Sequence, residues 1–97
     1  MTAATHRVDE VKFIETEPRD SGPMHWLRVT LARPGGTERK VGEYGVSVSS
    51  SDGYAALYDA DGATIDRFEN NDGAIYRAAV QWLNDNKSAY LTIHPDA

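Results

Sequence analysis

Cysteine is absent from the 97-residue sequence. Its absence excludes disulfide bonds, thiolate zinc sites, iron–sulfur ligation and a cysteine nucleophile. Long apolar runs are absent too, because the longest run, YAALY, is far shorter than the roughly 20 residues needed to cross a bilayer. The opening sequence MTAATHRVDE lacks the apolar core of a signal peptide. We therefore expect a cytoplasmic protein without membrane association, whose stability comes from packing.

Basic residues are outnumbered, because ten Lys and Arg face 15 Asp and Glu, for a formal net charge of −5. The excess is concentrated in residues 59–72, where the sequence DADGATIDRFENND contains five carboxylates and one arginine. An acidic surface is repelled by a phosphate backbone unless basic residues are segregated on one face. Nucleic acid is therefore the less expected partner, and a protein with a basic surface is the more expected one.

The length and composition are those of a single domain that covers residues 1–97. Two separate cores would each fall below the size that buries enough surface to fold alone. Hydrophobic residues make up 40% of the chain and aromatic residues 9%, which is enough for an ordinary small core. The sequence has no internal repeat and no low-complexity stretch.

Alternating apolar residues predict several short antiparallel strands, beginning with RVDEVKFIE near the N-terminus. The sequence HWLRVTLA has the clearest period of two, with Leu27, Val29 and Leu31 expected to face the core and Trp26 the opposite side. The RPGG turn predicts a hairpin with TERKVGEY, YGVSVSSS predicts a further strand, and the turn DADG predicts a second hairpin. Strand patterns without helices between them exclude a doubly wound parallel sheet.

One segment has helical periodicity, over about residues 72–86. Asn71 or Asp72 is expected to accept hydrogen bonds from the first-turn amides. The sequence SAYLTIHP after the helix predicts a final strand. The expected fold class is α+β: an antiparallel sheet of about five or six short strands with one amphipathic helix packed on one face, followed by the final strand. The apolar stripe of the helix consists of Ile75, Ala78, Ala79, Trp82 and Leu83.

Catalytic and metal-binding patterns are not found. A calcium loop that starts at Asp59 would need Gly at position 6 and Glu at position 12, whereas Gly62 stands at position 4 and Asn70 at position 12. The three histidines are not spaced as a zinc site, and GVSVS is not a nucleophile elbow. We expect no enzyme activity, no cofactor and no metal.

The carboxylate segment is the main candidate for function. Acidic side chains on neighbouring connections would steer a basic partner, and exposed aromatic residues would supply affinity. Alternatively, the same residues have only a structural role, because Asp and Asn are favoured in turns and at the start of helices. The candidate partner-binding residues are Asp59, Asp61, Asp66, Glu69 and Asp72, together with Trp26, Tyr54 and Tyr58.

A basic hairpin is the alternative site. The sequence KVGEYGVSV resembles a strand signature of RNA-recognition motifs, but Val46 and Val48 stand where further stacking aromatics would be needed. Basic residues mark a nucleic-acid site when they form a coherent stripe. The residues of this alternative nucleic-acid-binding site are Arg28, Arg33, Arg39 and Lys40.

The size, the acidity, the lack of cysteine and the expected sheet with one helix are similar to those of small phage-encoded inhibitors of bacterial defence, anti-CRISPR proteins among them. This likeness implies a viral protein that inhibits a nucleic-acid-handling complex by binding to it. The residues themselves predict a small acidic, non-enzymatic protein-binding module. The alternatives are a nucleic-acid-binding module and a structural subunit, such as a homodimer paired through an exposed edge strand.

Overall fold

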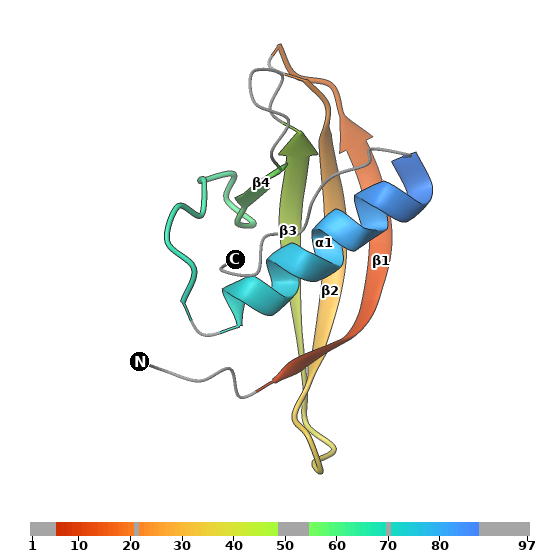
Figure 1. Cartoon of the computed structure of the whole chain (residues 1–97), viewed down its shortest axis with the longest axis vertical. Coiled ribbons are helices and arrows are strands. Elements are labelled where there is room, and N and C mark those ends of the chain that lie inside the picture. Colours follow the sequence, from red (N-terminus) through yellow and green to blue (C-terminus); the bar gives the residue numbers. More distant parts are fainter. Residues whose placement is uncertain (1–5, 21, 49–54, 70, 88–97) are drawn as a thin grey trace.

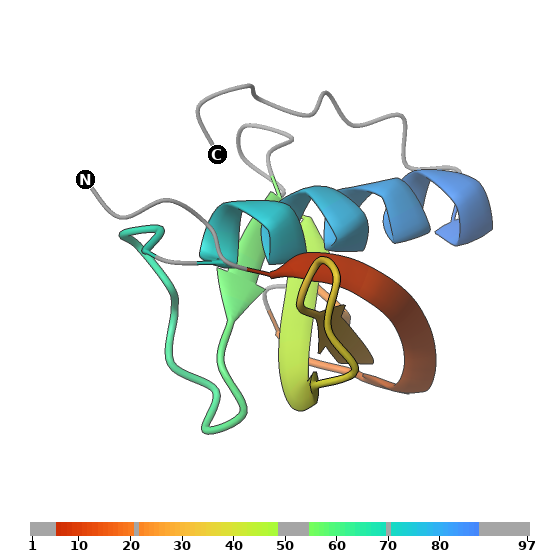
Figure 2. The same cartoon turned by 90° about the horizontal axis from the view of Figure 1, so that it is seen from below.

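The computed structural model describes residues 6–20, 22–48, 55–69 and 71–87, which form one antiparallel sheet and one helix. The strands follow each other in sheet order β1-β2-β3-β4, and α1 lies across one face (Figures 1 and 2). The α+β class with a single amphipathic helix is therefore confirmed. The elements are β1 (Arg7–Glu17), β2 (Met24–Ala32), β3 (Arg39–Val48), β4 (Ala55–Tyr58) and α1 (Asp72–Lys87).

The hairpin between β2 and β3 forms around the predicted RPGG turn. The N–H of Gly36 donates to the carbonyl of Arg33 at 3.0 Å, and Gly35 has a φ of 77°, a conformation that glycine adopts without a Cβ penalty. From this turn the register runs without a break from Ala32↔Arg39 to His25↔Val46. Residues 39–48 therefore form one long strand, where the sequence pattern predicts two short ones.

The predicted five or six strands are not confirmed, because the described residues contain four. The second predicted hairpin closes at its turn, but beyond the turn the chain makes a single bridge, Tyr58↔Thr64, and one further backbone bond from Ile65 N–H to the Leu57 carbonyl at 2.8 Å. Ile65 and Phe68 leave the sheet and pack instead on the side of the core. The predicted final strand, SAYLTIHP, lies outside the described residues.

The core lies between α1 and the helix-facing side of the sheet. Leu27, Val29 and Leu31 are buried there, as their alternation predicts. The buried stripe of α1 is rotated from the predicted one, because Tyr76 and Val80 are buried where Ala78 and Trp82 were expected. The Tyr76 ring packs against the Phe68 ring, with centroids 5.0 Å apart and planes tilted by 42°. The full cluster is Leu27, Val29, Leu31, Val46, Leu57, Ile75, Tyr76, Ala79, Val80 and Leu83.

β1 is a long but irregular edge strand. Its register with β2 shifts between Val8 and Glu10 and again between Phe13 and Glu15. Each shift leaves one extra residue on β1, which bends the strand and lets side chains three apart share a face. Val8 and Val11 consequently both pack against the core.

Candidate protein-binding surface

The acidic connection, residues 59–72, joins β4 to α1 and runs along the β4 edge of the sheet (Figures 1 and 2). It opens with a turn in which Gly62 N–H donates to the Asp59 carbonyl at 3.0 Å. The Asp59 side chain completes this turn, because its Oδ1 accepts from the N–H groups of Asp61 at 2.9 Å and Ala63 at 3.0 Å. Asp59 therefore shapes the connection as well as charging it.

The other end of the acidic connection starts the helix. The Asn71 carbonyl accepts the first helical bond from Ile75 N–H at 3.0 Å. The side chains of Asn71 and Asp72 were expected to accept hydrogen bonds from the first-turn amides of the helix, but they accept from other backbone groups. Asn71 Oδ1 accepts from His6 N–H at 3.2 Å, and Asp72 Oδ2 accepts from Glu69 N–H at 3.0 Å. Asp72 thus reaches back and fixes the entry into α1, while its charge still favours the positive end of the helix dipole.

The remaining carboxylates of the connection are free to act on solvent or a partner. Asp61, Asp66 and Glu69 are exposed. Among the residues that the structure describes, the ion pairs are formed between arginines and acidic residues outside the connection. None of them involves a carboxylate of the connection or its one arginine, Arg67. Within the described part of the chain these carboxylates therefore form no ion pair, and the guanidinium of Arg19 lies beside the turn that opens the connection.

The open face of the sheet, opposite α1, brings two predicted aromatic residues together. Trp26 is paired with Gly45, and Gly45 in turn with Tyr58, so the three share one face and one row across β2, β3 and β4. Gly45 is buried, and neighbouring side chains fill the space above it, because a Cβ at this position would stand 2.6 Å from Met24 Sδ and 3.2 Å from Trp26 Cζ3. Because Tyr58 directly precedes Asp59, this row ends at the acidic turn.

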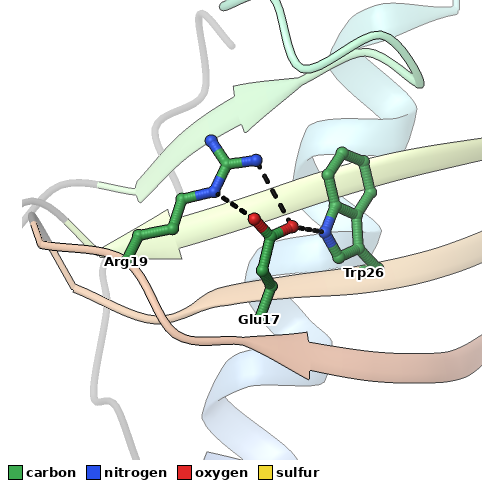
Figure 3. Close-up of polar contacts among 3 residues, drawn as sticks. All are labelled: Glu17, Arg19 and Trp26. Atoms are coloured by element: carbon green, nitrogen blue, oxygen red, sulfur yellow. Dashed lines mark hydrogen bonds and ion pairs between the residues drawn. The ribbon is translucent and has the colours of Figure 1, made fainter.

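The indole of Trp26 is held in place by a carboxylate (Figure 3). Its Nε1–H donates to Glu17 Oε1 at 2.9 Å. The same carboxylate accepts from Arg19, through Nε at 3.0 Å and Nη2 at 3.3 Å. Hydrogen bonds from Arg19 first and Trp26 second hold the pKa of Glu17 below its usual value. Glu17 and Arg19 thus fix one aromatic ring on the open face.

Arg19 also links this cluster to the acidic turn, since its Nη2 lies 4.0 Å from where a Cβ of Gly62 would stand. Sequence reasoning missed both Glu17 and Arg19. No local signal marks them, because Glu17 meets Trp26 through the pairing of β1 with β2 and the Arg19 side chain crosses toward a turn about forty residues away in sequence.

The negative charge of the acidic connection affects the pKa of Tyr44 in the sheet. This half-buried side chain on β3 faces α1 and packs against the core. Burial raises the pKa of its hydroxyl, and the charges of Asp72 and then Asp59 raise it further. Both ends of the connection therefore act electrostatically on one residue of β3.

The alternative basic site is divided between two faces. Arg28 pairs with Glu43 at 3.1 Å on the open face, whereas Lys40 is paired in register with Leu31 and faces α1. The other two arginines also have acidic neighbours, Arg33 with Glu38 at 3.8 Å and Arg39 with Asp9 at 3.5 Å. The nucleic-acid site stays a prediction, and the geometry gives it no coherent basic stripe.

Tyr54, the third aromatic residue predicted for the partner-binding surface, lies outside the described residues. Within the described part of the chain, no three His, Asp or Glu side chains gather as they would to hold a metal ion. The helix found there is too short and too polar to span a bilayer. A comparison with protein-family models, with curated proteins and with solved structures finds no match.

Proposed function

We propose that this protein is a non-enzymatic module that binds a partner protein through its acidic connection and the adjoining Trp26 and Tyr58. The observation that carries the proposal is the row Trp26, Gly45, Tyr58, which ends at a turn whose neighbouring carboxylates form no ion pair within the described chain. Unneutralised charge of this kind raises association rates and selects partners of opposite charge. The few residues that dominate the binding energy of typical interfaces are enriched in Trp, Tyr and Arg.

The partner is a protein with a basic surface. Proteins that handle nucleic acids expose such surfaces, so a module that covers one would act as an inhibitor. The similarity in size, acidity and fold class to phage-encoded inhibitors of bacterial defence suggests this biological setting. A nucleic-acid-binding module is the alternative, and it has less support because three of its four basic residues have carboxylates within 4.0 Å.

A charge variant tests the proposal without disturbing the turn. Asp61→Asn, Asp66→Asn and Glu69→Gln together remove three exposed charges and leave the structural carboxylates of Asp59 and Asp72 in place. The partner is first identified by affinity capture and mass spectrometry, and its affinity for each variant is then measured. We expect the triple variant to weaken binding at least tenfold, mainly through a slower association rate.

A matched control removes three other exposed charges, with Asp20→Asn, Glu38→Gln and Glu43→Gln. It has the same net charge as the test variant, so it separates local from global charge. We expect the control to bind the partner almost as well as the unmodified protein. Equal losses in the two variants would show that the acidic connection has no special role, and salt-dependent binding of random duplex DNA would favour the nucleic-acid alternative.

A further inference from the structure

A second surface, the β1–α1 groove, lies on the side of the molecule away from the acidic connection. It is formed by one face of α1 and the irregular part of β1, and this open groove has a volume of about 290 Å³. The register shift beside Asp9 creates its floor, because it turns both Val8 and Val11 toward the helix. Ala78 and Trp82 complete the floor from α1.

Trp82 is fixed at one end of the groove. Its ring stacks on Phe13 of β1 with centroids 5.3 Å apart and planes within 5°. The ammonium group of Lys87 lies 5.7 Å from the Phe13 ring and 5.9 Å from the Trp82 ring, at a distance typical of cation–π contacts. A floor held in this way loses little conformational entropy when a ligand binds.

The rim of the groove is acidic on both sides. Asp9 and Glu10 stand on the β1 side and Asp85 on the α1 side. Arg39 lies 3.5 Å from Asp9, and Gln81 donates to Asp85 at 2.8 Å, so both carboxylates retain a neighbour, whereas Glu10 is exposed. Among the described residues that line the groove, none is a lysine or an arginine.

We propose that the β1–α1 groove receives a short cationic segment of another protein, with one or two aliphatic side chains on its floor and Lys or Arg side chains at its rim. The apolar floor favours burial of aliphatic groups, and the acidic rim favours a positive segment. The volume of about 290 Å³ has room for one or two aliphatic side chains. A second copy of this acidic chain would bring like charges together, which disfavours it as the occupant.

Three capped peptides test the proposal in an NMR titration of the full chain. Lys-Leu-Lys-Leu-Lys carries both features, Lys-Ser-Lys-Ser-Lys carries charge alone, and Glu-Leu-Glu-Leu-Glu reverses the charge. The chain has two tryptophans, so the Trp82 indole reports on the groove and the Trp26 indole serves as an internal control. We expect the first peptide to shift Trp82, Val11 and Ala78, and each of the others to bind about tenfold more weakly or not at all.

Two variants make the result specific to the groove. Ala78→Phe fills the floor and is expected to abolish the shifts at Val11, with circular dichroism used to confirm that the helix is retained. Glu10→Gln with Asp85→Asn leaves the floor open and is expected to weaken the first peptide about threefold to tenfold. The proposal is overturned if the serine peptide binds as well as the leucine peptide, if the shifts gather at Asp61 and Glu69 instead, or if no peptide binds at millimolar concentration.

The proposed binding at the β1–α1 groove and the proposed binding at the acidic connection can be tested independently. Neutralising Asp61, Asp66 and Glu69 is expected to leave peptide binding in the groove unchanged within about twofold, because those residues do not line it. Loss of groove binding in that variant would show that the peptide response comes from total charge, and would overturn this inference without bearing on Trp26 and Tyr58.

Discussion

Gly45 of β3 lies directly against the Met24 side chain of β2, since a Cβ at position 45 would stand 2.6 Å from Met24 Sδ. Met24 is 2% exposed, so it has little room to give way. We expect Gly45→Ala to lower the free energy of unfolding by about 1–3 kcal/mol, as overpacking does in other proteins. Gly36→Ala is the control, because its nearest neighbours stand at 3.6 Å, and it should change stability by less than about 0.5 kcal/mol. Urea unfolding measures both, and equal effects would contradict the packing described here.

The structural and the exposed acids of the connection are expected to differ in their effect on stability. Asp59→Ala removes an acceptor from two backbone N–H groups, at a cost of about 1 kcal/mol. Asp61→Ala removes a side chain that accepts no hydrogen bond within the described residues, so its effect should be close to zero. Thermal unfolding of the two variants tests this. A destabilised Asp61→Ala protein with an unaffected Asp59→Ala protein would refute the assignment.

Stability is expected to fall as the pH is lowered below about 6.5, through His25. Burial, followed by the nearby charge of Lys87, lowers the pKa of this residue from its ordinary value of 6.5. The unfolded chain therefore takes up a proton at a pH where the folded protein does not, so stability is complete above 6.5 and decreases below it. The groups that face His25 are Thr16, whose hydroxyl lies 2.9 Å from Nδ1, and the Trp82 ring at 5.9 Å.

Urea unfolding between pH 8 and pH 5 measures this dependence. His25→Asn, which keeps a polar group near Thr16, should remove the slope near pH 6. The lowered pKa of Glu17 has the same sign and adds a further loss of stability below about pH 4.5. A free energy of unfolding that stays constant from pH 7 to pH 5 would contradict the burial of a neutral His25.

Tyr44 is expected to report the charge of the acidic connection. Its pKa is raised by burial and by Asp72 and Asp59, so the folded protein holds the phenol proton above pH 10, and stability falls as the pH rises past that value. Asp59→Asn keeps an oxygen acceptor in the turn but removes a charge, and should move the Tyr44 pKa toward its ordinary value. Asp61→Asn should leave it unchanged. NMR titration of the tyrosine ring signals distinguishes the two.

Local patterns predicted the parts of the fold that depend on local physics. The period of two in β2, the RPGG turn and the helix over residues 72–86 all appear in the structure, because each is encoded by adjacent side chains and turn chemistry. The irregular β1 was not predictable, since a register shift depends on the partner strand. The rotation of the buried stripe toward Tyr76 and Val80 depends on where α1 crosses the sheet, which no single helix encodes.

The candidate surface was predictable in composition but not in arrangement. Acidic residues 59–72 and the aromatic residues Trp26 and Tyr58 are visible in the sequence. Their adjacency depends on two strand registers that meet at Gly45, and the immobilised indole depends on Glu17 and Arg19. The arrangement of the basic residues was not predictable for a similar reason, because alternation along β3 sends Arg39 and Lys40 to opposite faces.

The two borders of the sheet have a consequence for how the protein behaves at high concentration. β4 has four residues, and its last two, Leu57 and Tyr58, are already bonded to Ile65 and Thr64. The two irregular positions of β1, among charged side chains, interrupt any continuous template. Fibril growth requires long, flat, uncharged borders that can stack repeatedly. Molecules of this kind should remain dispersed where many copies accumulate, and the same features disfavour a dimer joined border to border.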